Sequence, residues 1–554
     1  MSGFCFPPVI ALLATALPSV LTAGPPDFAH DVAPILYRAC AGCHRPGETG
    51  PFSLLSYGDA KKWAAQIAAV THNRYMPPWL PDAPDNFEGT RRLTDEEIRT
   101  ISDWASAGAP EGPPAEVPPP PSFPAGWQFG TPDLVLEAPA PFAVPASGPD
   151  VYWNFVLTPN QGSTRYVRAI EIRPGDRKLV HHANLLVDRW AASHAREVAP
   201  GKGFPGMDLE IMRSPFDPPG HLLFWKPGSV PHQEPEGLAW RLEPGDELVL
   251  NVHLHPTGKP EEVRPAIGLY FTDQPPTKFP LLVQIESDEA LDIPAGARDF
   301  EVKDDFQLPL DTDALAVYPH AHYLGKRLEA YATLPGGERR WLIRIPDWNP
   351  DWQAVFYYRE PVFLPKGTVI SMRYYYDNSA ANVRNPHQPP ERVKGGDRSI
   401  DEMAHLWLEL LPRGPGDRRR ELEEAVMRHR LEKNPKDFAA NFNLGAVLLA
   451  RLNAAGAVSA LETAVAAGPA RAEARNMLGL ALERVGRNAE ALAEYQIALK
   501  LRPDYVAARF NLANSQLKAG KLDEAIANLR QVVAANPDDP LPRRKLEEAL
   551  AARR

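Results

Sequence analysis

Five consecutive residues, Cys40-Ala41-Gly42-Cys43-His44, decide how the N-terminal part of the chain is organised. Two cysteines separated by two residues and followed by a histidine form the attachment motif of a c-type haem: both thiols bond to the haem vinyl groups and the histidine ligates the iron. A thioredoxin-like dithiol is the alternative, but it needs a βαβ context, whereas a short helix-like segment, residues 28–39, precedes this motif. The motif therefore predicts one covalent haem c, held by Cys40, Cys43 and His44.

The second axial ligand of this haem is expected from a proline-bounded loop, Arg74-Tyr75-Met76-Pro77-Pro78-Trp79. The thioether of Met76 would ligate the iron and raise its reduction potential. Two alternatives stay open: Met76 packs in a core, or His72 takes the ligand position. We predict Met76.

A helix from Thr94 to Ala107 is expected to close this region, because Thr94 and Glu97 have the spacing of a capping box. Together with the haem motif, this stretch resembles a small class I cytochrome c over roughly residues 27–112. The resemblance implies a small all-α haem domain, to which we assign residues 24–112.

The first 23 residues are expected to be a signal peptide, because an apolar run, residues 9–14, precedes a small-residue site at Leu21-Thr22-Ala23. An uncleaved membrane anchor is the alternative, since no Lys or Arg precedes the run. A membrane span needs about 20 apolar residues, and three prolines interrupt this stretch. We therefore predict a periplasmic or secreted protein, with no transmembrane segment in the mature chain.

Composition separates the rest of the chain into domains. The length of 554 residues exceeds what one hydrophobic core organises, and the net charge of −10 argues against nucleic acid as a partner. A proline-rich linker is expected at residues 113–129. A second boundary is expected near Pro412, where proline becomes rare and alanine, leucine and glutamate dominate.

The segment after this boundary, residues 413–554, contains a repeat. Four prolines recur every 34 residues, at Pro435, Pro469, Pro503 and Pro537. Leu444-Gly445 and Leu478-Gly479 keep the same register, which puts small residues where paired helices approach closely. The pattern resembles the tetratricopeptide repeat over about residues 437–536, with a capping helix from Asp539. It implies an α-solenoid that docks a protein partner, and a passive stabilising appendage is the alternative.

The middle of the chain alternates short β-type runs with Pro and Gly turns, as in all-β sandwiches. Strands are expected at residues 166–172, 247–253 and 369–375. Histidines gather at three places in this region: His181-His182, His253 with His255, and His320 with His322.

The spacing of these histidines permits metal binding. Residues i and i+2 of a strand point to the same face, so His320 and His322 can aim both imidazoles at one ion. The adjacent pair His181-His182 can share an ion only at a bulge or a twisted strand end. Imidazole-only sites suit copper or zinc, and an added thioether selects for Cu(I). A hydrogen-bonded structural role is the alternative for each pair.

Four runs then carry a family resemblance: Val180-His181-His182-Ala183, Leu250-Asn251-Val252-His253, His320-Ala321-His322-Tyr323-Leu324-Gly325-Lys326 and Asp401-Glu402-Met403. They resemble the type II copper monooxygenases, the ascorbate-dependent enzymes that include peptidylglycine α-hydroxylating monooxygenase and dopamine β-monooxygenase. The resemblance implies two eight-stranded jelly-roll sandwiches with one copper in each. We assign them to residues 130–275 and 276–412.

The resemblance also implies the ligands of two coppers. His181, His182 and His253 match the three-histidine, electron-transfer copper, with His255 as the strongest competitor for the place of His253. The catalytic copper, which binds dioxygen, is matched by His320, His322 and Met403. Whether His255 or His405 joins a copper site stays open.

The chain departs from the family at the substrate side. Where the peptide enzyme has a carboxylate-binding arginine, this chain has Tyr318, and after Met403 it has His405 and Trp407 in place of asparagine and tyrosine. The substrate, a small molecule or a peptide, is therefore left open.

The resulting expectation is a copper monooxygenase that hydroxylates a C–H bond with O2, with the haem replacing ascorbate or relaying electrons from a redox protein. A non-catalytic haem and copper scaffold, assembled through the repeats, is the alternative.

Overall fold

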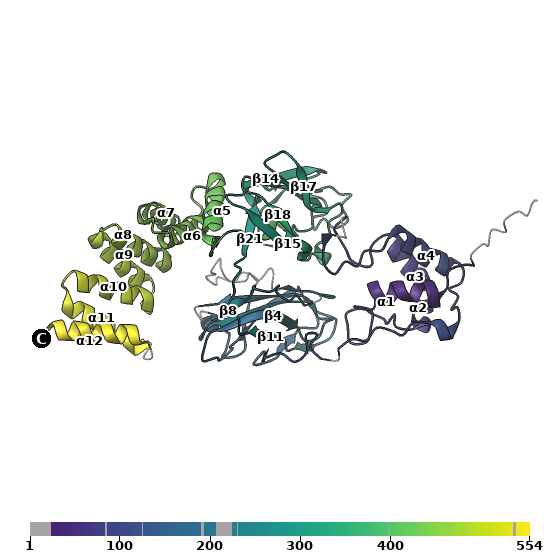
Figure 1. The fold of residues 1–554 in the computed structure, drawn as a ribbon, viewed down its shortest axis with the longest axis horizontal. Helices are drawn as coiled ribbons and strands as arrows, with labels where there is room; N and C mark the ends of the chain where they lie inside the picture. Colours follow the sequence, from purple (N-terminus) through teal and green to yellow (C-terminus); the bar gives the residue numbers. More distant parts are fainter. Residues whose placement is uncertain are drawn as a thin grey trace, which may run out of the picture. The chain divides into compact units, whose positions relative to one another are not determined.

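The computed structural model describes residues 24–82, 86–124, 126–189, 193–206, 224–229, 231–396, 398–535 and 539–553 (Figure 1). The expected signal peptide, residues 1–23, and Pro537 of the repeat pattern lie outside the described residues. The chain divides into two compact units, Met1–Pro78 with Arg91–Ser122, and Trp79–Thr90 with Phe123–Arg554. Among the described residues, no helix is both long and apolar enough to span a membrane.

The first unit is helical. Its main elements are η1 (Phe28–Val32, π-helical), α1 (Ala33–Ala39), α2 (Tyr57–Lys62), α3 (Ala64–His72) and α4 (Asp95–Ser106). The predicted capping box of α4 is confirmed, because the Thr94 hydroxyl accepts from Glu97 N while the Glu97 carboxylate accepts from Thr94 N at 2.8 Å. Phe28, Leu36 and Trp104 are buried in the core that the helices enclose. A backbone hydrogen bond joins the start and the end of the unit: Phe28 N donates to Pro110 O at 3.0 Å.

Residues 79–90 interrupt this unit, although residues 24–112 were expected to form one continuous domain. The described residues of this segment, which we call the strap, pack on strand β18 (Phe356–Leu364) of the second unit. Phe87 forms an isolated antiparallel bridge with Tyr358 and is only 1% exposed. The ring of Trp79 meets Phe356 edge-on at 5.6 Å. The strap packs on β18 and not on the helices of the first unit, because the large aromatic side chains of Trp79 and Phe87 are buried against this strand.

The first β domain contains two larger sheets and one strand pair. The orders are β1-β11-β4-β8, β6-β3-β9-β5-β7 and β10-β2. Its strands are β1 (Leu134–Glu137), β2 (Phe142–Val144), β3 (Val151–Leu157), β4 (Arg165–Arg173), β5 (Val180–Asp188), β6 (Phe204–Pro205), β7 (Phe224–Trp225), β8 (Trp240–Leu242), β9 (Glu247–Leu254), β10 (Glu261–Val263) and β11 (Ala266–Thr272). Both larger sheets contribute to one core, for example Ile267 and Val167 from one and Leu250 and Leu185 from the other.

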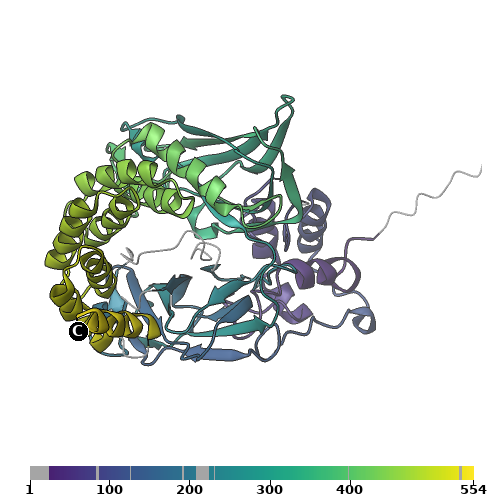
Figure 2. The same ribbon diagram turned by 60° about the vertical axis from the view of Figure 1, so that its left-hand side comes forward.

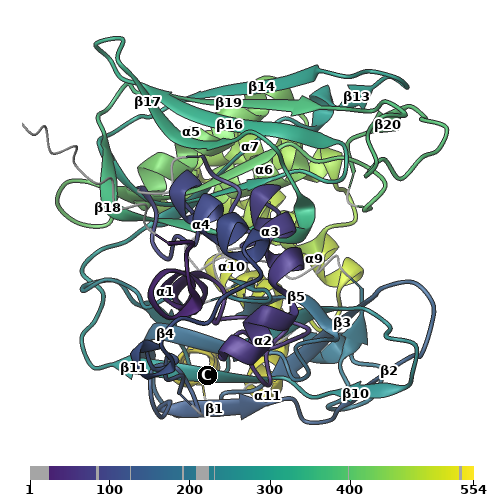
Figure 3. The same cartoon turned by 90° about the vertical axis from the view of Figure 1, so that its right-hand side faces the viewer.

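The second β domain repeats this plan. Its sheets have the orders β12-β21-β15-β18, β14-β19-β16-β17 and β13-β20; Figure 3 shows β14, β19 and β16 side by side in one sheet. Besides β18, the strands are β12 (Leu281–Glu286), β13 (Asp292–Ile293), β14 (Phe300–Gln307), β15 (Thr312–His320), β16 (Gly325–Thr333), β17 (Arg339–Ile345), β19 (Val369–Tyr376), β20 (Val393–Lys394) and β21 (His405–Pro412). The strands expected at 166–172, 247–253 and 369–375 are confirmed as β4, β9 and β19.

The two β domains share one strand order. Leaving out the separate pairs β10-β2 and β13-β20 and the edge strand β6, and counting the other strands along the chain, gives the orders 1-8-3-6 and 2-7-4-5 in each domain. Except for strands 4 and 5, neighbours in each sheet are not consecutive along the chain, so the core depends mainly on long-range pairing.

The C-terminal region is a series of paired helices, which Figure 2 shows as a curved array coloured green to yellow. They are α5 (Arg419–Lys433), α6 (Phe438–Ala450), α7 (Ala454–Ala467), α8 (Ala472–Arg484), α9 (Asn488–Leu501), α10 (Val506–Lys518), α11 (Leu522–Ala535) and α12 (Pro540–Arg553). The predicted close approach at small residues is confirmed: a Cβ at Gly479 would lie 2.6 Å from the Tyr495 ring, and one at Gly445 would overlap Leu461.

Candidate metal centres

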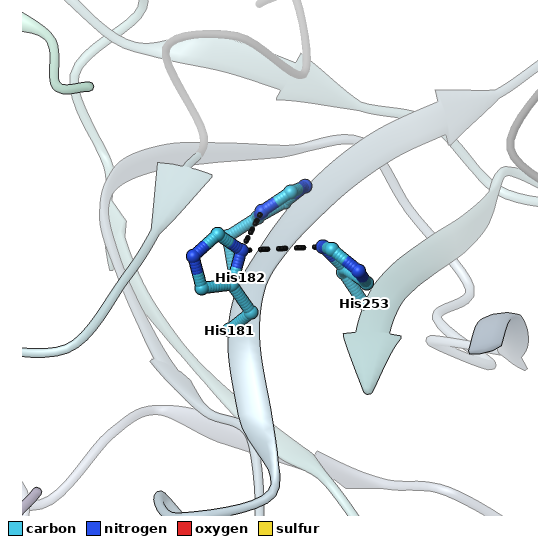
Figure 4. A group of neighbouring side chains, drawn as sticks. All are labelled: His181, His182 and His253. Atoms are coloured by element: carbon cyan, nitrogen blue, oxygen red, sulfur yellow. Dashed lines mark hydrogen bonds between the residues drawn. The ribbon is translucent and has the colours of Figure 1, made fainter. Parts of the chain in front are cut away.

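Three histidines converge in the first β domain. His181 and His182 lie on β5 and His253 lies on the neighbouring strand β9, where His182 and His253 are cross-strand partners. His181 Nδ1 lies 3.2 Å from His253 Nδ1 and 3.3 Å from His182 Nδ1, and Figure 4 shows the three rings facing one another. Ligand atoms of all three lie within 4.8 Å of one another. We call this set the first histidine group.

A β-bulge makes this convergence possible. The pairing of β5 with β9 shifts register between Val180 and His182, so the adjacent histidines do not point to opposite faces. A bulge is one of the two geometries in which adjacent histidines were expected to share an ion. Leu250 and Val252 of β9 point into the hydrophobic core, and His253 therefore lies on the opposite face of the sheet.

Burial keeps the first histidine group neutral. It lowers the pKa of His253 to about 4, mainly by desolvation, although the hydrogen bond that His253 donates to Asp150 acts in the other direction. Desolvation also lowers the pKa of His181, and that of His182 well below its ordinary value. Neutral imidazoles present a lone pair, so this environment suits a cation better than protons.

Asp150 orients His253 and was not anticipated from the sequence. Its carboxylate lies 2.9 Å from His253 Nε2 and 2.6 Å from His255 Nδ1. A carboxylate that holds the far nitrogen of an imidazole fixes the ring and its tautomer, as is common behind metal ligands. His255, the expected competitor of His253, shares Asp150 with it and is not part of the first histidine group.

The second β domain places His320 and His322 differently from the prediction. Strand β15 ends at His320, so the expectation that both residues share one strand face is wrong. The rings are nevertheless neighbours, with centroids 5.2 Å apart. His320 Nδ1 donates to Gln353 Oε1 at 2.8 Å, and His322 Nδ1 donates to the Asp401 carbonyl at 3.0 Å. Both rings would therefore offer Nε2 to an ion.

Glu402 joins the chain segments that carry His322 and Met403. One oxygen of its buried carboxylate accepts from His322 N and from Met403 N, the latter at 2.9 Å, and the other accepts from Leu324 N at 2.9 Å. Burial raises the pKa of Glu402 to about 8, although these backbone donors act in the opposite direction. Glu402 was part of the run that suggested Met403, but its structural role was not foreseen.

His405 begins strand β21 and pairs across the sheet with His320. Its Nε2 lies 2.6 Å from Asp288 Oδ2. Its Nδ1 is buried and has no hydrogen-bond partner among the described residues. The rings of His320 and His405 are 6.2 Å apart. Within the described chain, these second-domain histidines are not gathered within 4.8 Å of one another, unlike the first histidine group.

The two β domains belong to one compact unit, and aromatic rings connect their histidines. His182 lies 5.6 Å from the Phe224 ring, Phe224 lies 6.2 Å from Tyr318, and Tyr318 lies 6.0 Å from His320. Tyr318 also stacks on Trp407 at 5.3 Å.

The helical unit presents the Cys40 and Cys43 thiols at the end of α1, and both are free. His44 Nδ1 donates to Phe52 O at 3.2 Å, which leaves Nε2 as the nitrogen for an iron. The His44 ring also packs on Phe52 at 4.9 Å. Burial lowers the pKa of His44, so the ring is neutral, as a ligand must be. Two thiols and an oriented imidazole fit the donor set of a c-type haem.

The two candidates for the distal ligand differ in their burial. Arg74 adopts a left-handed backbone, at φ 54°, and Met76 N donates back to Val70 O at 3.2 Å. Met76 is half-buried, whereas His72 is exposed at the end of α3. A half-buried thioether is the better candidate for a site that excludes water.

Comparisons with known proteins concern the C-terminal helices. A tetratricopeptide repeat family model matches residues 447–505 and 476–540. No curated protein matches the chain. Two crystal structures of MamA are 20% and 19% identical, cover 24% of this chain and 81% and 74% of the MamA chains, and have a TM-score of 0.24. The family model and the 34-residue spacing agree: the C-terminal region consists of tetratricopeptide repeats.

Proposed function

We propose that the protein is an exported copper-dependent monooxygenase, which inserts one oxygen atom of O2 into a substrate C–H bond and receives electrons through a fused c-type haem. The observation that carries the proposal is the convergence of His181, His182 and His253 around one point. The common strand order of the two β domains supports the jelly-roll architecture that such an enzyme requires.

The first histidine group would hold the electron-transfer copper. Its three imidazoles come from a β-bulge and a paired strand, and their low pKa values keep the nitrogens available. Imidazole-only donors accommodate both oxidation states of copper, and a preformed group limits reorganisation between them.

His320, His322 and Met403 would hold the catalytic copper. Sulfur favours Cu(I), the form that reacts with dioxygen, so bound copper would supply O2 binding and one-electron chemistry here. The protein orients the donors: Gln353 and the Asp401 carbonyl fix the two rings, and Glu402 fixes the Met403 backbone. Tyr318, buried beside His320, stands where the peptide enzymes have an arginine, which favours a substrate without a free carboxylate.

Cys40, Cys43, His44 and Met76 would hold the haem, which delivers electrons singly in place of ascorbate, or relays them from a redox protein. The ring contacts through Phe224 and Tyr318 offer a route between the two coppers. Export is proposed from residues 1–23, and haem attachment and copper loading would follow in the periplasm. The repeats would dock a protein partner, such as the electron donor.

Labelled oxygen tests the reaction. The copper-loaded protein is incubated with the small-molecule fraction of a periplasmic extract, a reductant and ¹⁸O2, and labelled products are sought by mass spectrometry. Met403→His should retain copper but lose the products, because a third imidazole replaces the donor that favours Cu(I). His387→Ala, at a histidine outside the groups described, is the matched control. Labelled products at the parent level from Met403→His would refute the assignment.

A non-catalytic scaffold is the second candidate, favoured by the tetratricopeptide repeats. In that case haem and copper would serve electron transfer or metal storage within a larger assembly. Substrate-dependent O2 uptake distinguishes the two, since a scaffold consumes O2 at the same rate with and without the extract.

A further inference from the structure

The buried face of strand β21 carries a histidine with an unsatisfied nitrogen. His405 is 8% exposed, and its Nδ1 has no hydrogen-bond partner among the described residues. Buried polar atoms are normally paired, because leaving one unpaired costs free energy. An unpaired imidazole nitrogen on a buried surface therefore points to a missing partner.

The other side of this ring is firmly held. His405 Nε2 lies 2.6 Å from Asp288 Oδ2, and Asp288 Oδ1 accepts from Ala404 N at 2.8 Å. Asp288 is thus positioned by the backbone next to His405. With the proton on Nε2 facing the carboxylate, Nδ1 carries the lone pair. The ring is oriented to accept, and a cation is the partner that fits.

The first histidine group contains the same arrangement with its partners in place. His253 Nε2 is held by Asp150, and its Nδ1 lies 3.2 Å from His181 Nδ1. His253 is the cross-strand partner of His182, as His405 is of His320. In both domains the strand that carries the histidine has a second neighbouring strand, and the aspartate lies at the end of that neighbour. Asp150 precedes β3, the second neighbour of β9, and Asp288 follows β12, the second neighbour of β21.

We propose that His405, oriented by Asp288, is a third imidazole ligand of the second centre and binds copper through Nδ1 beside His320 and His322. The inference rests on the proposed function, which places copper there. It changes the donor set from two imidazoles and a thioether to three imidazoles, with Met403 as the additional soft donor. The rings of His320 and His405 are 6.2 Å apart, farther than the rings of the first histidine group, so these two rings move closer together when the ion binds.

Copper X-ray absorption on the full chain tests the donor set. His181→Ala is used as the background, so that only the second centre is loaded with Cu(I). Three imidazole scatterers are expected with His405 present and two in His405→Ala. The Cu(I) affinity, measured by competition with a chromogenic chelator, should fall at least tenfold. His387→Ala in the same background is the control and should change neither quantity.

A second pair of variants protects the test against misfolding. Asp288→Asn leaves the His405 ring in place but removes its carboxylate, and should weaken Cu(I) binding less than His405→Ala while keeping three imidazoles. His405→Gln fills the space with a polar side chain, and should behave as His405→Ala. Unchanged scattering and affinity in both His405 variants would overturn the inference.

The outcome is separable from that of the proposed function. If His320→Ala abolishes copper at the second centre and His405→Ala changes neither the scattering nor the Cu(I) affinity, only the added ligand is refuted. If His320→Ala also leaves the copper content unchanged, no copper centre exists in this domain and the proposed function fails.

Discussion

The two β domains share a strand order but organise their histidines in different ways. In the first domain the histidines lie within two paired strands, β5 and β9, and a bulge brings all three together. In the second domain only His320 and His405 lie on strands, β15 and β21, whereas His322 and Met403 lie in the segments beyond them. These strand pairs also belong to different sheets of the common order.

The two centres therefore differ in their rigidity before a metal binds. Ladder hydrogen bonds on both sides hold the backbone of His253, so the first group is preorganised. The second centre depends on one buried carboxylate, Glu402, to hold two connecting segments in place. A preorganised site loses little entropy on binding, whereas a site built on loops is easier to disturb and to tune.

Substitution of a single histidine ligand should remove one metal and leave the other bound. His182→Ala removes one ligand of the first group and should lower the copper content from two to one per chain, leaving the second centre filled. His322→Ala should do the converse. Metal analysis after dialysis gives the content, and carbon monoxide binding to the reduced protein reports the second centre. Loss of both metals from either variant would mean that the two groups form one site.

A smaller effect is expected from the carboxylate behind the second centre. Glu402→Gln retains one acceptor oxygen but cannot satisfy all three backbone donors, which costs about 1–3 kcal/mol. The Cu(I) affinity of the second centre should fall about 5- to 150-fold, and that of the first should stay unchanged.

Asp188→Asn is the matched control for this change. Asp188 is also a buried carboxylate and accepts from Ser193 N at 2.8 Å, but it lies at the end of β5 away from the histidines. Equal loss of affinity at the second centre from both variants would show that Glu402 acts only through general stability.

Sequence patterns predicted the elements better than the contacts between them. Capping residues, the proline period and alternating strands are local signals, and α4, the repeats and β4, β9 and β19 followed from them. The bulge at His181 was required by the metal hypothesis, but its presence depends on how β5 pairs with β9, two strands far apart in sequence.

The residues that support the histidines were not predictable in this way. Asp150 and Asp288 lie about 100 positions from the histidines they hold, and neither belongs to a motif. The i, i+2 rule failed at His322 because Glu402 ends the strand by capturing the His322 and Leu324 amides. The strap was missed because its partner, β18, is about 270 residues away.

A pH-dependent difference is expected where helix α5 joins the second β domain. Burial raises the pKa of Glu423 to about 8, although Arg420 and Arg419 act in the opposite direction. In the unfolded chain the pKa is about 4.3. The contribution of the protonated Glu423 side chain to the free energy of unfolding is therefore complete below about pH 4.3 and is lost as the pH rises through about 8. The loss is at most about 1.4 kcal/mol per pH unit.

Glu423→Gln should remove this loss. The unfolding temperature of α5 and the second β domain, followed by circular dichroism, should fall by a few degrees more in the parent than in the variant between pH 6 and pH 9. The transition of the first β domain should not change. Glu432→Gln, at an exposed position of the same helix, is the control and should follow the parent.

The smallest effect is expected from removing the repeats beyond α5. His429 lies 2.9 Å from Asp304 of β14, Arg430 pairs with Glu286 of β12 at 2.5 Å, and Leu422 and Val426 extend the core of the second β domain. Helix α5 therefore acts as part of that domain.

A chain ending at Asn434 keeps these contacts and should retain both coppers and the thermal stability of both β domains, because later helices contact mainly their neighbours. A chain ending at Pro412 should lower the unfolding temperature of the second β domain while the first stays unchanged. Copper loss from the chain ending at Asn434 would show that the repeats support the second centre directly.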